Sequence, residues 1–143
     1  MRQGGLDPSL RTVAVLPLEN KTTTPGLDRE LTELLSNDIR RRLGLREAPE
    51  SRADVIVTGT IAKYDVDMPV AFSADPGRGA GTRRKLQVWV DISIRNPSSG
   101  RILYQKTGVS ADGQYAEGAE ADGRKEAFAK VVSDIIQGIQ SQW

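Results

Sequence analysis

Apolar and polar residues alternate along Lys85 to Arg95, and this period of two predicts a β-strand with one apolar face. The apolar face consists of Leu86, Val88, Val90, Ile92 and Ile94. The turn-forming sequence NPSSG at 96–100 and a second strand from Arg101 to Val109 complete a hairpin. The pattern does not fix the register of this second strand, and a shift of one residue reverses its faces. The face occupied by Tyr104 therefore stays open.

Two shorter apolar runs predict two more strands. The run from Thr12 to Leu18 ends near Pro17, which lacks the amide that a strand interior needs. The run from Asp54 to Asp65 contains Gly59, which indicates a bulge or the close approach of another backbone. Residues 66–84 are rich in glycine and proline and have no period, so we expect a long hairpin loop there.

Apolar residues three and four positions apart predict two amphipathic helices. The first stripe is Leu27, Leu31, Leu34, Leu35, Ile39 and Leu43, and the second is Phe128, Val131, Val132, Ile135 and Ile139. For the first helix we expect Thr24 as the N-cap, Pro25 at the first helical position and Gly44 at the end. The second helix follows a polar stretch from Ser110 to Gly123, with Asp122 as the expected cap.

The predicted order is strand, helix, three strands, helix (β-α-β-β-β-α). Each helix has one apolar stripe and the central strand has one apolar face, so the fold class is α+β. We expect a four-stranded sheet with both helices packed on one face. Residues 12–143 then form one domain, preceded by a flexible segment at 1–11. The other sheet face, which carries Trp89 among polar residues, would lie against solvent or a partner.

Composition excludes several classes of function. A chain of 143 residues can bury a core without disulfides or metals, and this chain contains no cysteine and no histidine. Thiol nucleophiles, histidine bases and the usual zinc sites are therefore absent. The net charge of +1 gives no argument for nucleic acid, and no segment reaches the ~20 apolar residues of a membrane span. Asp65 and Asp67 could suggest acid/base chemistry, but we interpret them as turn residues. We predict no enzyme activity, no cofactor and no metal site.

The loop ENKTTTPG, residues 19–26, stands between a strand and a helix, where many proteins bind phosphate. A phosphate loop needs several glycines whose amides converge on the ligand. This loop has one glycine, and Pro25 removes an amide where one is wanted. We therefore interpret it as a connection.

The segment PGRGAGTRRK, residues 76–85, is the richest binding candidate. Arg78, Arg83, Arg84 and Lys85 could contact anionic groups such as lipid phosphates. Loops commonly carry charge, so the simpler interpretation is a solvated hairpin tip. The alternative, functional interpretation is an anion-binding site. Trp89 is a further candidate, either as a partner contact or as an isolated exposed aromatic residue.

Four segments together resemble the lipopolysaccharide-assembly lipoprotein LptE family. They are RTVAVLPLENKTTTPGLDRELTELL, RADVIVTGTIAKYD, VWVDISIRNPSSGRILYQKTGVS and the last helix ending at Trp143. The resemblance extends from Leu10 to Trp143 and consists of an order of segments, not of a catalytic motif.

The resemblance implies a function that periodicity does not show. Members have two helices against a mixed four-stranded sheet and are lipid-anchored at the periplasmic face of the outer membrane. They lie as a plug inside the β-barrel LptD and assist in placing lipopolysaccharide in the outer leaflet, without enzyme activity. Some bind lipopolysaccharide through basic residues. The family anchors through an N-terminal cysteine, which this sequence lacks, so we expect residues 1–11 to follow a removed signal or anchor.

A second resemblance stays open. The sequence AVLPLENKT followed by a helix is also similar to the N-terminal domain of TolB and to activators of penicillin-binding proteins. This alternative implies a periplasmic lipoprotein module that binds a soluble or peptidoglycan-associated partner.

Overall fold

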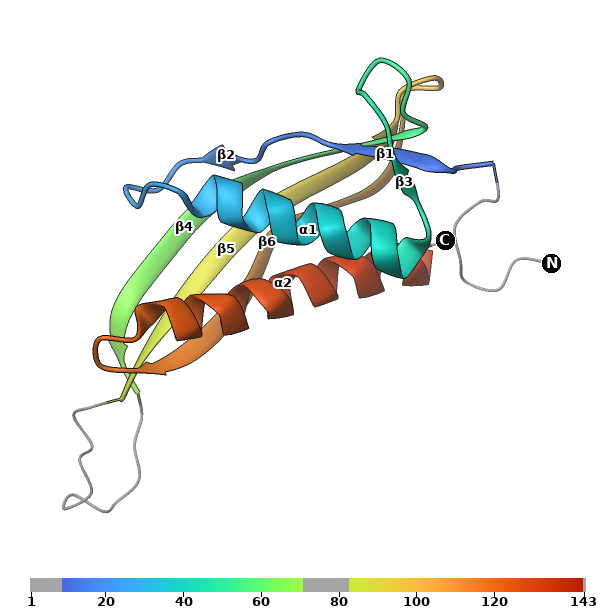
Figure 1. The fold of residues 1–143 in the computed structure, drawn as a ribbon. Coiled ribbons are helices and arrows are strands. Elements are labelled where there is room, and N and C mark those ends of the chain that lie inside the picture. The colour runs from blue at the N-terminus through green and yellow to red at the C-terminus, as the bar shows by residue number, and fades with distance from the viewer. Residues whose placement is uncertain (1–8, 71–82, 143) are drawn as a thin grey trace.

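The computed structural model describes residues 9–70 and 83–142, and it shows a mixed six-stranded sheet with two helices on one face (Figure 1). The strands are β1 (Thr12–Val15), β2 (Glu19–Asn20), β3 (Arg46–Glu47), β4 (Val55–Pro69), β5 (Arg83–Asn96) and β6 (Arg101–Ala116). The helices are α1 (Leu27–Leu43) and α2 (Glu120–Gln142).

The strand order is β3-β1-β4-β5-β6, and β2 also pairs with β4. The pairs β1–β3, β1–β4 and β2–β4 are parallel, whereas β4, β5 and β6 form an antiparallel meander. A parallel pair needs a crossover connection, and α1 supplies it between β1 and β4. The three long strands of the meander therefore make the main platform of the domain.

The predicted α+β class and the two helices on one face are confirmed, but the sheet has six strands instead of four. The two additional strands, β2 and β3, have two residues each, too short for any pattern of hydrophobicity. The predicted end of the last strand at Val109 is wrong, because β6 continues to Ala116. Its helix-side positions there include Gly113 and Tyr115, which bury little aliphatic surface and so hide the alternation.

The predicted start of α1 is wrong by two residues. The helix begins at Leu27, its N-cap is Gly26 with φ of 88°, and no side chain caps it. Thr24 is unavailable as a cap because it belongs to the preceding loop, where the side-chain amide of Asn20 donates to the backbone carbonyl oxygen of Thr24 at 2.9 Å. Pro25 consequently lies outside the helix.

The predicted end of α1 is confirmed, since Gly44 has φ of 70° in the left-handed region. The predicted cap of α2 is wrong. This helix begins at Glu120, so Asp122 lies in its first turn, where a negative charge suits the positive end of the helix dipole.

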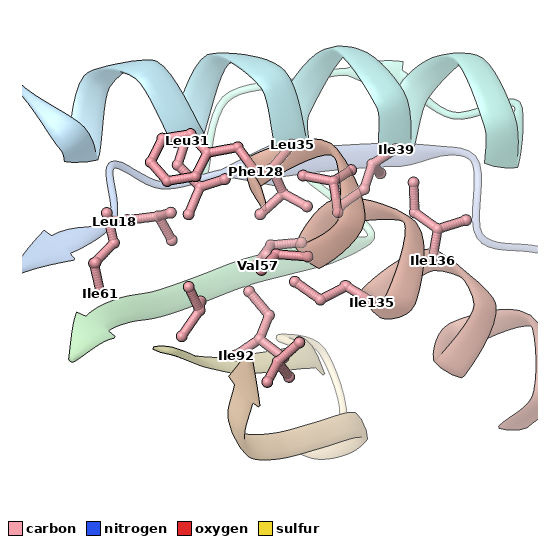
Figure 2. Packing of buried hydrophobic residues seen from close by; sticks show 14 of the residues in the cluster. Leu18, Leu31, Leu35, Ile39, Val57, Ile61, Ile92, Phe128, Ile135 and Ile136 are labelled. Atoms are coloured by element: carbon pink, nitrogen blue, oxygen red, sulfur yellow. The ribbon is translucent and has the colours of Figure 1, made fainter. Parts of the chain in front are cut away.

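The core lies between the helices and the inner face of the sheet, and Figure 2 shows the side chains of both layers meeting there. Leu31, Leu35 and Ile39 project from α1 toward Phe128 of α2 and Val57 of β4. The other labelled members of this cluster are Leu18, Ile61, Ile92, Ile135 and Ile136. Among the described residues no polar or charged side chain is fully buried, so the layers are held by aliphatic packing.

Glycine allows close approach at two places in the sheet. A Cβ at Gly113 would lie 1.8 Å from the backbone oxygen of Gly123, so β6 and the start of α2 touch through their backbones. At Gly59 a Cβ would lie 2.6 Å from the backbone oxygen of Asp91. The close approach predicted for Gly59 is thus confirmed, whereas the bulge in this part of β4 lies beyond it, between Ile61 and Lys63.

Candidate functional site

The face of β4, β5 and β6 opposite the helices is covered by neither helix, and we call it the open face (Figure 1). The pairing of the strands and the hollow described below place on it Thr58, Thr60, Lys63, Asp65, Lys85, Gln87, Trp89, Asp91, Ser93, Arg95, Gln105, Thr107, Ser110, Asp112 and Gln114. Antiparallel sheets commonly present one face to water. Polarity alone therefore does not identify this face as a binding surface. The positions of particular side chains have to show whether it could bind a ligand.

Trp89 lies near the middle of the open face and is half-buried. It stands opposite Lys63 of β4 and Ser110 of β6. The Lys63 ammonium lies 4.7 Å from the centre of the indole ring, which is a cation–π contact, and 3.4 Å from the Asp65 carboxylate. Trp89 therefore lies between polar side chains of the two neighbouring strands.

The register settles the face of Tyr104. It pairs with Ile94, lies on the helix side and is only 8% exposed. Its neighbour Ile102, at 48% exposed, stands opposite Arg95. Trp89 therefore shares its face with no second described aromatic residue of β6.

The alternation of side chains along β5 places the predicted basic residues on different faces of the sheet. Lys85 lies on the open face, where its ammonium is 3.8 Å from the Asp112 carboxylate. Arg84 is next in the alternation, pairs with helix-side Tyr115, and lies 3.9 Å from Glu117. Arg83 donates to the side-chain oxygen of Gln114 at 3.4 Å. Arg78 lies outside the described residues. These long, partly exposed contacts are weak, so the cations remain available to a stronger anionic ligand.

A polar network that the sequence did not predict joins the two helices to β4. The Arg124 guanidinium donates from Nε to both carboxylate oxygens of Glu30, at 2.9 and 3.1 Å. Glu120 accepts from the Tyr64 hydroxyl at 2.8 Å and lies 3.6 Å from Arg124. Burial, together with the bond to Glu120, raises the pKa of Tyr64 well above its ordinary value. All four groups are engaged with one another, so the network holds the layers together.

Asp65 and Asp67 do not converge on a common point. Asp65 pairs with Lys63 on the open face. Asp67 has φ of 58°, and the Tyr115 hydroxyl both accepts from its amide and donates to its carboxylate, each at 3.0 Å. The interpretation of these acids as turn residues is wrong, because both lie within β4, which extends to Pro69.

A shallow hollow of about 310 Å³ lies in the open face beside Trp89. Four hydroxyl side chains line it: Thr58, Thr60, Ser93 and Thr107. Glu19 of β2, Asp91 of β5 and Gln105 of β6 supply acceptors and an amide. These residues come from four strands far apart in the sequence, so no local motif could have indicated them.

The loop from Glu19 to Gly26 is a self-contained connection. The Asn20 side-chain oxygen accepts from the amide of Thr22 at 3.0 Å, and the amide of Thr24 donates to the Thr22 hydroxyl at 3.2 Å. The amide of Lys21 donates to the carbonyl of Ile61. With these donors already used, the loop has no converging set of amides for a phosphate.

Two structural features are absent from residues 9–70 and 83–142. Neither helix is both long and apolar enough to cross a bilayer. Within the same residues, no three acidic side chains gather in a way that could hold a metal ion.

Residues 10–139 match the model of the LptE family, described as lipopolysaccharide-assembly. No curated protein matches the chain.

Several solved structures share the fold. A protein from Xanthomonas campestris, XCC0632, has a TM-score of 0.60 at 10% identity, covering 96% of this chain and 92% of its own. A minor lipoprotein from Acinetobacter baumannii has a TM-score of 0.58 at 12% identity, covering 93% and 94%. The PelC dodecamer from Paraburkholderia phytofirmans has a TM-score of 0.58 at 16% identity, covering 92% and 88%. At these identities the likeness concerns the fold alone.

Proposed function

Because the chain belongs to the LptE family of lipopolysaccharide-assembly proteins, we propose that it is a non-enzymatic component of the lipopolysaccharide transport machinery. In this proposal it sits as a plug inside the LptD β-barrel and assists the insertion of lipopolysaccharide. It works at the periplasmic face of the outer membrane, held by a lipid anchor outside these 143 residues. The observation that carries the proposal is the family match over residues 10–139.

The shape and chemistry of the domain support a role as a plug. The lumen of a large outer-membrane barrel is polar, so a protein inside it needs polar outer surfaces around a rigid core. The outer side of α1 exposes Arg29, Glu33 and Asn37, while Leu31 and Leu35 are buried against the sheet. In our proposal this helix layer lies against the barrel wall and leaves the open face toward the transported glycolipid.

The basic start of β5 is the proposed contact for the phosphates of the glycolipid. Arg83, Arg84 and Lys85 lie there in sequence, and the fourth predicted contact, Arg78, lies outside the described residues. Their present partners are weak surface contacts, so exchange for a phosphate costs little. Such contacts lose strength as salt screens them.

Co-purification tests the proposal. The lipidated protein, co-expressed with LptD and extracted in mild detergent, should remain with the barrel through two chromatographic steps. A protein that leaves the barrel in mild detergent, or that is retained instead by a peptidoglycan-associated partner, would count against this function.

The glycolipid contact is tested separately. A variant with Arg83→Glu and Lys85→Glu should retain LptD but carry less lipopolysaccharide. The matched control reverses two exposed arginines at the end of α1, Arg41→Glu and Arg42→Glu, and should carry the normal amount. Equal lipopolysaccharide in both variants would contradict the role of the basic start of β5.

A further inference from the structure

The open face carries no excess of positive charge, which limits the ligands it can recognise. Beyond the basic start of β5, Lys63 and Arg95 are its cations, and Glu19, Asp65, Asp91 and Asp112 are its acids. Lys63 is already beside Asp65, at 3.4 Å. A surface without excess positive charge does not attract phosphate groups over distance. Its ligand is therefore expected to be uncharged and polar.

The hollow adds the donors and acceptors for such a ligand. Its volume of about 310 Å³ lies at the lower end of the roughly 300–1,000 Å³ typical of small-molecule sites. Most such sites are mainly apolar, whereas seven of the nine residues that line this one carry a hydroxyl, a carboxylate or an amide, and Gly59 and Ile92 complete it. Hydroxyl side chains can both donate and accept, which suits a ligand that itself carries many hydroxyls.

Each of the two carboxylates of the hollow accepts one hydrogen bond from within the protein, through one of its two oxygens. Glu19 accepts from the Thr60 hydroxyl with Oε1 at 3.3 Å. Asp91 accepts from the amide of Gly108 with Oδ1 at 2.9 Å. Among the described residues these bonds leave the second oxygen of each carboxylate free to accept from a ligand. A carboxylate that accepts from a ligand hydroxyl makes a charge-assisted bond, stronger than a neutral one.

Trp89 supplies an apolar platform beside the hollow. It lies two residues from Asp91 on the same face of β5, and its side chain is half-buried. A pyranose ring has one face of C–H groups and a rim of hydroxyls, so it matches an aromatic surface next to hydrogen-bonding groups. Lys63 covers part of the indole, but it is an exposed side chain that can move aside.

We propose that the hollow and Trp89 together bind a saccharide unit, with its hydroxyls in the hollow and its C–H face on the indole. The source of the saccharide rests on the proposed function: the sugar portion of the transported glycolipid would lie here, beyond the phosphates at the basic start of β5. The second source is a glycan strand of peptidoglycan, which carries the same chemistry.

Nuclear magnetic resonance titration of the isotopically labelled full chain tests this site. One arm uses the core oligosaccharide of lipopolysaccharide after removal of its lipid and phosphates, and the other uses a soluble peptidoglycan glycan fragment. We expect amide shifts at Thr60, Asp91 and Gln105 that persist at high salt. Binding of only the glycan fragment would support the site but assign it the other source. If neither sugar shifts these residues, or only a phosphorylated sugar does, the proposal is overturned.

Matched variants make the test specific. Gln105→Ala removes an exposed amide of the hollow, and Gln137→Ala removes an exposed amide on α2. The first should weaken saccharide binding by about fivefold to tenfold, as expected for one hydrogen bond, and the second should leave it unchanged. Trp89→Leu should abolish the shifts with the fold intact. Equal affinity in both glutamine variants would overturn the proposal.

The same variants separate this inference from the proposed function. If Trp89→Leu loses the sugar and keeps LptD, both proposals are supported. If the unchanged chain binds LptD but no sugar, this inference fails alone. If Trp89→Leu loses LptD and the unchanged chain binds no sugar, the open face is a protein contact and the saccharide site is refuted.

Discussion

Replacing Gly113 by alanine tests how closely α2 lies on β6. The added Cβ would stand 1.8 Å from the backbone oxygen of Gly123 and 3.1 Å from the amide nitrogen of Ala127. A carbon–oxygen contact without strain is about 3.3 Å, so the two backbones must separate by about 1.5 Å. The obstructing atom belongs to a helix backbone and cannot rotate away, so the whole start of α2 has to move.

The cost follows from the contacts that this movement disturbs. Overpacking of a well-packed site costs about 1–3 kcal/mol. The separation also strains the 2.9 Å hydrogen bond from the Gln114 amide to the Glu126 carboxylate. Loss of this bond costs about 1 kcal/mol. Alanine recovers about 0.5–1 kcal/mol because glycine is the more flexible residue in the unfolded chain. The net loss is about 1–3.5 kcal/mol in the free energy of unfolding.

Urea unfolding followed by circular dichroism measures this loss, and a thermal scan should show a fall in Tm of about 3–12 °C. The control is Ser110→Ala, an exposed position of the same strand, which should change stability by less than about 0.5 kcal/mol. If Gly113→Ala were as stable as the unchanged protein, β6 and α2 could not be in backbone contact and the packing derived for them would be refuted.

Three further substitutions test the polar contacts. Glu30→Gln should lower the free energy of unfolding by about 1 kcal/mol, because it weakens a two-bond contact with the partly buried Arg124, and urea unfolding measures it. Asn20→Ala should cost about 1 kcal/mol in the same assay, because its side chain holds the loop before α1 through two backbone bonds. Asp54→Asn should cost about 1–2 kcal/mol at neutral pH, because the carboxylate accepts from two amides. The difference should vanish in acid, as stability curves against pH would show.

The sign of the last prediction follows from the pKa. The hydrogen bond from the Arg11 amide, with help from Thr12, lowers the pKa of Asp54 below its ordinary value of 3.8. A lowered folded-state pKa means that the stabilisation is complete above 3.8 and is lost as the pH falls through the folded value. A difference between Asp54→Asn and the unchanged protein that persisted in strong acid would contradict this reasoning.

For the Glu30→Gln prediction, the control is Glu33→Gln, an exposed position of α1 that should have almost no effect on stability.

The candidate site could be predicted only in part. The alternation along β5 correctly placed Trp89 and Lys85 on one face, because a strand fixes the direction of every second side chain. It could not show that Lys63 stands over the indole, since the bulge between Ile61 and Lys63 shifts the register of β4. Nor could it show that Glu19 and Asp91 line one hollow, because Glu19 reaches it only through the parallel pairing of β2 with β4.

By itself the sequence determined the class of fold, the two helices and the buried stripes such as Leu31 and Leu35, because apolar periodicity is a local property of the chain. Only the tertiary structure decided which face Tyr104 occupies, how far β6 extends, and that Gly113 touches α2. These features depend on strand register and on distances between segments far apart in the chain, and no local pattern of residues carries that information.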